Sequence, residues 1–342
     1  MTEMNKTWVL RARPVGDVKE SDLELVEAPL APLKDGEVRA RTIYLSLDPT
    51  NRIWMSDKDA YLPPVGLGEP MRGGGLSLVT ESRFDGLAAG DIVNTGLAHW
   101  SLYNTLPGAS LAKMPQLPGV PLTAFMGPLG ATGMTAYFGL MDIAKPKAGE
   151  TVVVSAAAGA VGSMVGQIAK IQGCRVVGIA GSDEKCKWLV ETAGFDAAIN
   201  YKTEDLGAAL DRHCPDGIDI NFENVGGKIM DTVIARLNDF SRMPLCGLIS
   251  TYNATEPVPG PYNFDNLLMR RTLVKGFIVI DYYPRFAEGI QQMAQWLMEG
   301  KLKFETDVVR GLENAPSSLS RLFEGKNLGK LVVQVSDEPN KS

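Results

Sequence analysis

The stretch Thr151 to Lys185 constrains the fold of this chain more than any other; it reads TVVVSAAAGAVGSMVGQIAKIQGCRVVGIAGSDEK. It opens with the run Thr151–Val154, whose β-branched residues are typical of a strand buried on both faces. Apolar residues then recur at helical spacing (Val161, Met164, Val165, Ile168 and Ala169). A second apolar strand is predicted at Arg175–Ala180. This strand–turn–helix–strand order is the context that a dinucleotide-binding turn requires.

The turn itself, Gly159-Ala160-Val161-Gly162, has small residues where a pyrophosphate would need them. Gly159 lets the backbone approach the phosphates, whose charge would meet free N–H groups and the positive end of the helix. Gly162 lets the helix pack closely on the strand. The first glycine of the usual G-x-G-x-x-G is Ala157 here, so the motif gains its specificity from its position between strand and helix. An α/β turn that binds no nucleotide remains an alternative.

A membrane helix is the other interpretation of this stretch, because Thr151–Ala169 contains no charge and includes Gly162-x-x-x-Gly166. The glycines, the β-branched start and Lys170 at its end argue against a membrane span.

The residues after the second strand indicate which dinucleotide is bound. NAD-binding units usually have an Asp or Glu at the end of that strand, for the ribose 2′-OH. Here the strand ends in Ala180-Gly181-Ser182, and Asp183 falls where Ser182 would cap the next helix. Lys185 opposes the dipole of that helix, and a 2′-phosphate beside it would give the reason. The pattern predicts NADP(H).

Length and composition limit the class of protein. A chain of 342 residues predicts two domains, and a formal net charge of −6 without a basic run argues against nucleic-acid or anionic-membrane binding. The four cysteines form no C-x-x-C pair, which is typical of reduced thiols. The N-terminal segment lacks the apolar core of a signal peptide, so we expect a cytoplasmic protein.

The chain order predicts a discontinuous first domain. Short alternating segments over 1–125 indicate a β-rich domain, a folded barrel. Strands alternate with helices over 126–304, which predicts a Rossmann-type, doubly wound parallel sheet; we expect its later strands at Ala197–Tyr201, Ile218–Glu223, Pro244–Ser250 and Val274–Ile280. The tail, 305–342, would return to the first domain through a strand at Lys330–Val335.

Candidate ligand-binding residues fall at the carboxyl ends of these predicted strands, where such sheets bind ligands: Tyr201, Asn224 and Ser250-Thr251-Tyr252-Asn253. In the first domain, a proline-punctuated segment containing Arg52, Trp54 and Tyr61 could line a pocket, although a solvated loop is the simpler interpretation.

The sequence lacks the residues that several kinds of catalysis require. A catalytic zinc site needs imidazole and thiolate ligands, yet His99 and His213 are the only histidines and no cysteine precedes Cys174. We therefore predict no metal site. No G-x-S-x-G nucleophile elbow is present either. Hydride transfer remains, in which a cofactor supplies the chemistry and the protein orients it.

Assembled, these residues resemble the zinc-independent medium-chain dehydrogenases/reductases, and within them the group of prostaglandin reductases, plant alkenal double-bond reductases and bacterial curcumin reductases. The resemblance runs nearly end to end. Its motifs are Leu45-Ser46-Leu47-Asp48-Pro49, Gly133-Met134-Thr135-Ala136-Tyr137, the turn with its flanks (156–163), Gly181-Ser182-Asp183-Glu184-Lys185, Glu223-Asn224-Val225-Gly226-Gly227, 246–253 and 325–330.

The resemblance implies a GroES-like first domain and a role for individual residues. Lys185 and Tyr201 match positions that hold the 2′-phosphate, and Gly159, Ala160, Val161 and Gly162 match the pyrophosphate turn. Further cofactor-contacting positions are matched by Asn224, Cys246, Gly247, Ser250, Thr251, Tyr252, Phe277, Ile278, Val279 and Asn327. Tyr252 matches the tyrosine that binds the substrate carbonyl or donates a proton. Tyr61 matches a second pocket tyrosine in some members, Arg52 stands in the same segment, and we expect both to bind substrate. Thr50-Asn51-Arg52 replaces the Tyr-Met-Arg of many relatives, which changes a pocket wall.

The implied activity is NADPH-dependent reduction of the carbon–carbon double bond of α,β-unsaturated ketones or aldehydes, with a small-molecule enone or alkenal as substrate. A quinone reductase of the same superfamily and a non-catalytic NADPH-binding protein remain alternatives. The resemblance also implies a homodimer.

Overall fold

The computed structural model describes residues 3–115 and 117–339. The chain divides into two compact units. The first comprises residues 1–126, 307–326 and 331–342, and the second comprises 127–306 and 327–330. Residues 1–2, 116 and 340–342, which the predicted first domain includes, lie outside the described residues. No helix in the part of the chain that the structure describes is long and apolar enough to cross a membrane.

A six-stranded parallel sheet forms the centre of the second unit, with strand order β10-β9-β8-β11-β12-β13. This order is that of the doubly wound dinucleotide-binding fold. The strands are β8 (Thr151–Val154), β9 (Arg175–Ala180), β10 (Ala197–Asn200), β11 (Ile218–Phe222), β12 (Leu237–Leu245) and β13 (Leu273–Gly276). All four residues of β8 are buried, as its β-branched run predicts.

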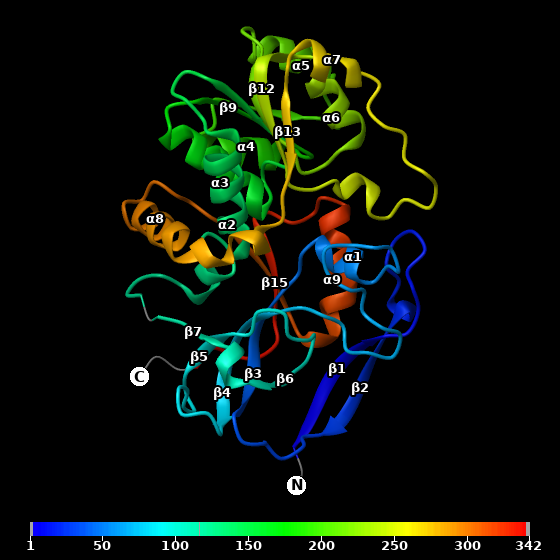
Figure 1. Ribbon diagram of the computed structural model, residues 1–342, viewed down its shortest axis with the longest axis vertical. Coiled ribbons are helices and arrows are strands. Elements are labelled where there is room, and N and C mark those ends of the chain that lie inside the picture. Colours follow the sequence, from blue (N-terminus) through cyan, green and yellow to red (C-terminus); the bar gives the residue numbers. More distant parts are fainter. Residues whose placement is uncertain (1–2, 116, 340–342) are drawn as a thin grey trace. The chain divides into compact units, whose positions relative to one another are not determined.

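Helices cover both faces of this sheet. Figure 1 shows α3 (Ala160–Ile171) and α4 (Asp183–Glu191) on one side, and α5 (Leu206–His213) and α6 (Gly227–Ile234) on the other. The remaining helices of the unit are α2 (Ala131–Phe138), which continues as a π-helix over Gly139–Ala144, α7 (Phe264–Met269) and α8 (Phe286–Met298). Leu210 of α5 and Val233 of α6 belong to one buried core together with Val153 and Val177 of the sheet.

The predictions for the fold class and for 151–180 are confirmed, but two strand positions were wrong. The predicted strand Pro244–Ser250 is only the end of β12, which begins at Leu237. Exposed polar residues such as Asp239 conceal the start of that strand, and the apolar residues from Cys246 onward form a loop and a short 3-10 helix, Ile249–Thr251. Likewise β13 ends at Gly276, and a 3-10 helix occupies Val279–Arg285.

The first unit is β-rich. A hairpin pairs β1 (Met4–Leu10) with β2 (Leu23–Pro29), and a seven-stranded sheet has the order β14-β15-β3-β4-β5-β7, with β6 paired to β3. Its strands are β3 (Glu37–Ser46), β4 (Gly75–Ser82), β5 (Ile92–Asn94), β6 (Tyr103–Pro107), β7 (Ala112–Lys113), β14 (Thr306–Arg310) and β15 (Lys330–Gln334). β15 pairs antiparallel with β3, so the tail of the chain completes this sheet.

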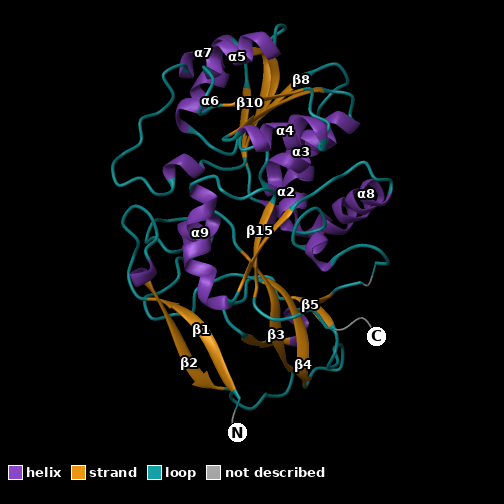
Figure 2. Ribbon diagram, turned by 180° about the vertical axis from the view of Figure 1, so that it is seen from behind, coloured by secondary structure: helices purple, strands orange, loops and turns teal. Residues whose placement is uncertain are grey.

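Helix α9 (Ala315–Phe323) belongs to the same unit, and Figure 2 shows it together with β1 and β2. Leu319 packs with Trp8 and Leu10 in one buried cluster, and the Trp8 indole donates to the carbonyl of Leu312 at 2.8 Å.

The segment after β3 folds as helix α1 (Thr50–Trp54) with Asn51, Arg52 and Trp54 buried. The interpretation of this segment as a solvated loop was therefore wrong. The alternation of polar and apolar residues in this segment does not indicate burial. The buried Arg52 guanidinium is hydrogen-bonded to backbone carbonyls, and no charged partner nearby in the sequence marks it as buried.

Candidate functional site

The order of the parallel strands defines a switch point between β8 and β11, because the chain winds outward in opposite directions from these two neighbours. Ligands of doubly wound sheets bind beyond the carboxyl ends of the strands at such a point. The turn Ser155–Gly159 follows β8, and Glu223 and Asn224 follow β11. The cofactor residues predicted from sequence all lie in the second unit.

The turn after β8 leads into helix α3 with a tight backbone. Ala156 has φ +48°, a left-handed conformation that costs a non-glycine residue roughly 1–2 kcal/mol. Gly159 is the N-cap of α3 in an extended conformation, and Ala160 and Val161 begin the helix. A Cβ on Gly162 would lie 2.5 Å from the carbonyl oxygen of Ala156. At Gly162, therefore, α3 packs closely on the turn that follows β8 rather than on the strand itself.

A segment from the end of the chain lies against this turn. The amide of Gly329 donates to the carbonyl of Ala158 at 2.9 Å, and Gly159 and Gly329 form an isolated parallel bridge. Asn327 is buried, and its side-chain amide donates to the carbonyl of Gly329 at 2.9 Å. Asn327 therefore holds its own segment beside the turn that follows β8.

The end of β9 carries the residues expected at the adenosine ribose. Ser182 caps α4, as predicted: its hydroxyl oxygen accepts from the amide of Lys185, which puts Lys185 in the first helical turn. The Asp183 carboxylate accepts from the side-chain amide of Asn200 at 2.7 Å. Asp183 is thus engaged by β10, and no other carboxylate lies between Ala180 and Asp183 in the sequence.

Gly181 lies at the same end, and its missing side chain leaves room between two larger ones. A Cβ built on Gly181 would be 3.2 Å from Cε1 of Tyr201 and 3.2 Å from Cε of Lys202. Tyr201 directly follows β10 and is 40% exposed. Lys202 was not among the residues predicted from the sequence, although its position next to Tyr201 could have indicated it.

Glu223 is a buried residue of the site that sequence reasoning missed. It is fully buried, and its Oε1 accepts from the Ser155 hydroxyl at 2.9 Å and from the amides of Val225 and Gly226 at 2.7 and 2.8 Å. Asn224 joins the same network: its amide donates to the Ser155 hydroxyl oxygen at 2.8 Å, and its side chain donates to the Ser155 carbonyl at 2.7 Å.

The segment Cys246–Tyr252 follows β12 and is hydrogen-bonded to the turn that follows β11. The amides of Cys246 and Gly247 donate to the carbonyl of Glu223, and the Ser250 hydroxyl donates to the carbonyl of Val225 at 2.6 Å. Within the segment, the Thr251 hydroxyl donates to the carbonyl of Leu248.

Tyr252 closes this segment. The amide of Leu248 donates to the Tyr252 phenol oxygen at 3.0 Å. In this bond the phenol oxygen is the acceptor, so the bond does not use the hydrogen of the hydroxyl group. An N–H donor at that oxygen also favours negative charge on it.

Phe277, Ile278 and Val279 follow β13. Phe277 is buried, and its ring meets that of Phe222 edge-on, with centroids 6.3 Å apart. Ile278 and Val279 are half-buried at the start of the 3-10 helix.

The two predicted substrate residues belong to the first unit. The Tyr61 phenol is hydrogen-bonded to the Thr50 hydroxyl, and burial raises the pKa of Tyr61. Arg52 is only 5% exposed, and its Nη2 donates to the carbonyls of Pro14 and Gly16 at 3.0 and 3.2 Å. The Arg52 side chain thus secures backbone of its own unit.

The thiols do not form a nucleophilic or metal-binding centre. All four cysteines are free. Burial raises the pKa of the Cys246 thiol to about 12, with a further contribution from the charge of Glu223. Within residues 3–115 and 117–339, no three His, Cys, Asp or Glu side chains gather in a group that could hold a metal.

Comparison with known proteins gives matches along the whole chain. A family model described as the N-terminal domain of oxidoreductase matches residues 6–114, and one described as zinc-binding dehydrogenase matches 160–297. The NADPH-dependent curcumin reductase of Escherichia coli is 44% identical, covering 98% of each chain. The NADP(+)-dependent 2-alkenal reductase of Nicotiana tabacum is 43% identical, again covering 98% of each. The crystal structure of CurA from Vibrio vulnificus in complex with NADPH has a TM-score of 0.92 at 43% identity, covering 97% of this chain and 100% of that one.

Proposed function

This chain belongs to the medium-chain dehydrogenase/reductase family, and from that premise we propose that it is an NADPH-dependent reductase of α,β-unsaturated ketones and aldehydes. The observation that carries the proposal is the end-to-end similarity to relatives named curcumin reductase and 2-alkenal reductase. The geometry of the second unit supports it independently.

The residues of the second unit fit NADPH. Gly159 presents the start of α3 without a side-chain cap among the described residues, which suits the pyrophosphate. Beside Gly181, the ring of Tyr201 and the stem of Lys202 flank a position that has no side chain of its own, and Lys185 stands in the first turn of α4. Two lysines and a tyrosine in the segments that follow β9 and β10 suit a 2′-phosphate, whereas a ribose hydroxyl would call for a carboxylate.

When bound, NADPH supplies the hydride that reduces the conjugated double bond. As the hydride reaches the β-carbon, negative charge develops on the substrate carbonyl oxygen, and a hydrogen-bond donor directed at that oxygen lowers the barrier. The α-carbon then takes a proton from Tyr252, the ribose hydroxyl or water, which completes the reduction. We assign the role of hydrogen-bond donor at the carbonyl oxygen to Tyr252, because an ordinary phenol is protonated at neutral pH. The bond from the Leu248 amide orients the Tyr252 oxygen and stabilises charge on it as its proton is shared.

In the first unit, we propose that Tyr61 contacts substrate, since this residue is 40% exposed. The buried contacts of Arg52 support a different role for that residue, namely holding α1 against residues 14–16. Arg52 would then shape the pocket without touching the substrate.

One experiment tests the activity and separates the alternatives. NADPH absorbance is followed with a panel of alkenals, aryl enones, prostaglandin-like ketones and quinones. Faster oxidation with enones and alkenals supports the proposal, faster oxidation with quinones indicates a quinone reductase, and binding without turnover on any acceptor indicates a non-catalytic NADPH-binding protein. Equal binding of NADH and NADPH, or a requirement for zinc, would contradict the assignment.

The protein is proposed to be a homodimer through the edge of the parallel sheet. β13 is the last strand of that sheet, and all four of its residues are exposed, including the apolar Leu273 and Val274. Leu268 and Met269 on α7 are also exposed. An exposed apolar edge strand is suited to pairing with a second copy. Light scattering of the purified chain gives the mass directly, and a monomeric mass would contradict this arrangement.

We also propose a cytoplasmic location, which the four free thiols support.

A further inference from the structure

Glu223 is a carboxylate with no exposure to solvent, at the point where the two halves of the parallel sheet diverge. Buried carboxylates are costly unless their oxygens are fully hydrogen-bonded. Four groups donate to Glu223: the Ser155 hydroxyl and the amides of Val225 and Gly226 to Oε1, and the Asn221 side-chain amide to Oε2 at 3.0 Å. All four are donors, which is the arrangement that a carboxylate, acting only as an acceptor, satisfies.

These contacts connect two turns that lie far apart in the sequence. Ser155 begins the turn that leads to Gly159 and α3, while Val225 and Gly226 lead into α6. The Ser155 hydroxyl donates to Glu223 and accepts from the amide of Asn224, so it is held from both sides. The backbone carbonyl of Glu223 extends the network to Cys246 and Gly247 after β12.

The same contacts distinguish two helices that begin at this edge of the sheet. The amides of Val225 and Gly226 precede α6 and are already occupied by Glu223 Oε1. Among the described residues, both helices have a glycine N-cap without a side-chain hydrogen bond, Gly226 for α6 and Gly159 for α3, so the carboxylate of Glu223 before α6 is what distinguishes them. A diphosphate is favoured at a helix start that has no carboxylate next to it.

We propose that Glu223 is a positioning residue for NADPH: it fixes the Ser155 turn to the Asn224 turn and directs the cofactor's phosphates to α3. Glu223 itself touches no cofactor atom in this role. The proposal rests on the proposed function for the identity of the ligand, but it concerns affinity for NADPH rather than the acceptor that is reduced.

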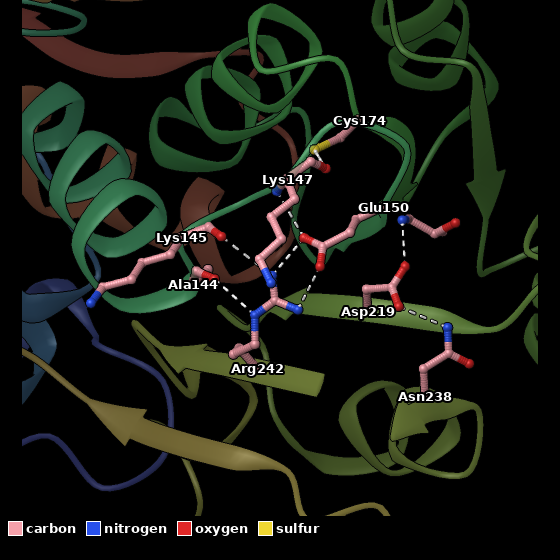
Figure 3. A network of polar contacts seen from close by, with 9 residues as sticks. Ala144, Lys145, Lys147, Glu150, Cys174, Asp219, Asn238 and Arg242 are labelled. Carbon is pink, nitrogen blue, oxygen red and sulfur yellow. Dashed lines mark hydrogen bonds and ion pairs between the residues drawn. The ribbon is translucent and has the colours of Figure 1, made fainter. Parts of the chain in front are cut away.

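The test compares Glu223→Gln with a matched control, Asp219→Asn. Asp219 lies near the start of β11, whereas Glu223 follows its end. The Asp219 carboxylate accepts from the amide of Thr151 at 2.8 Å and from the Asn238 side chain at 2.9 Å (Figure 3). Both substitutions replace one carboxylate oxygen by a donor, so both should destabilise the fold. Only Glu223 lies at the cofactor edge.

NADPH binding is measured by calorimetry at a temperature where each variant is folded, together with KM and kcat for an enone. We expect Glu223→Gln to raise the Kd and the KM for NADPH at least about tenfold, with a smaller change in kcat, since it turns a charged acceptor into a donor facing donors. Glu223→Asp, which keeps the charge, should recover part of that affinity. Asp219→Asn should leave the Kd within about twofold.

An unchanged Kd in Glu223→Gln, or an equal loss in Asp219→Asn, would overturn the proposal. Should Glu223→Gln fail to fold, Ser155→Ala removes one link of the same network, and its Kd should rise at least about threefold, by roughly the loss of one hydrogen bond; no rise would overturn the proposal equally. The unmodified protein distinguishes the two levels: absence of enone turnover with intact NADPH binding refutes the enone reductase and leaves the test of Glu223 valid.

Discussion

Replacing Gly162 by alanine tests the packing of the pyrophosphate turn with a single methyl group. The added Cβ would lie 2.5 Å from the carbonyl oxygen and 3.1 Å from the carbonyl carbon of Ala156, and 2.8 Å from Cα of Ala157. These are backbone atoms, which cannot move aside by changing a rotamer. Ala156 is already in the left-handed region, so the turn has little freedom to relax.

Two effects of opposite sign set the expected stability of Gly162→Ala. Alanine in place of glycine gains up to about 1 kcal/mol in a helix. Overpacking a tightly packed site costs typically about 1–3 kcal/mol, and contacts with backbone place this case at the upper end. The net loss is about 1–2 kcal/mol, which lowers the melting temperature by roughly 2–8 °C in a domain of this size.

The same displacement should weaken cofactor binding, because the start of α3 and the turn before it move apart. Loss of one charge-assisted hydrogen bond to a phosphate raises the Kd for NADPH about tenfold or more. The assays are thermal unfolding without ligand and calorimetric titration with NADPH. A melting temperature that rises with the helix propensity of alanine, together with an unchanged Kd, would refute the reasoning.

Gly289→Ala is the matched control for this substitution. Gly289 is buried within α8, but the nearest atom to an added Cβ is Sδ of Met134 at 2.6 Å, followed by ring atoms of Phe138 and Tyr137 at 3.3 Å. A methionine end can shift at little cost. We expect a stability change within about 1 kcal/mol and no change in NADPH affinity.

Three further substitutions test the other parts of the site and the fold. Lys185→Ala should lower the preference for NADPH over NADH about tenfold or more, since it removes a cation proposed to meet the 2′-phosphate; binding of both cofactors is measured by fluorescence titration. Tyr252→Phe should lower kcat about tenfold or more with NADPH binding unchanged, and unchanged turnover across several enones would remove Tyr252 from the mechanism. Arg242→Met should cost about 2–3 kcal/mol at pH 7, less than for a fully buried pair, because the Arg242 guanidinium binds Glu150 at 2.5 and 3.0 Å and the carbonyl of Ala144 (Figure 3). Burial tends to raise the pKa of Glu150, but the bonds from Arg242 and from the Lys147 amide leave it lowered, so this stabilisation is present above about pH 4.3 and is lost as the pH falls through the folded-state value; denaturant unfolding should show the gap between the two proteins closing in acid.

Short-range sequence patterns were enough to predict the elements at the centre of the second unit, but not the full extent of β12 on the other side of the sheet. The β-branched run Thr151–Val154 and the helical spacing after it are signals within one short window, and both elements occur where predicted. β12 is different, because its first residues are polar and its place in the sheet depends on pairing with β11 and β13. Burial of Arg52 was equally invisible, since its acceptors, the carbonyls of Pro14 and Gly16, lie far away in sequence.

The residues of the candidate site likewise divide into those with a local sequence signal and those without one. Residues of the phosphate turn could be selected from glycine spacing, and Lys185 from its unfavourable place in a helix dipole. Glu223 could not be selected, because a carboxylate next to asparagine and glycines in sequence is normally solvated. Its role depends on Ser155 being brought beside it when β8 pairs with β11.

The way in which the helices begin at the carboxyl edge of the sheet explains why one of them is available to an anion. Ser182 accepts from an amide of α4, Asp205 accepts from an amide of α5, and Glu223 accepts from the two amides that lead into α6. Among these helices in the described residues 117–339, α3 and α6 both have a glycine N-cap without a side-chain hydrogen bond, and the amides that precede α6 are bonded to Glu223. Unbonded amides at a helix start are costly when shielded from water, so a start without a side-chain cap needs water or a ligand as its partner. The uncapped start of α3 therefore suits phosphate oxygens, whereas α4 and α5 have side-chain caps and the start of α6 has the carboxylate of Glu223 beside it, which would repel phosphates.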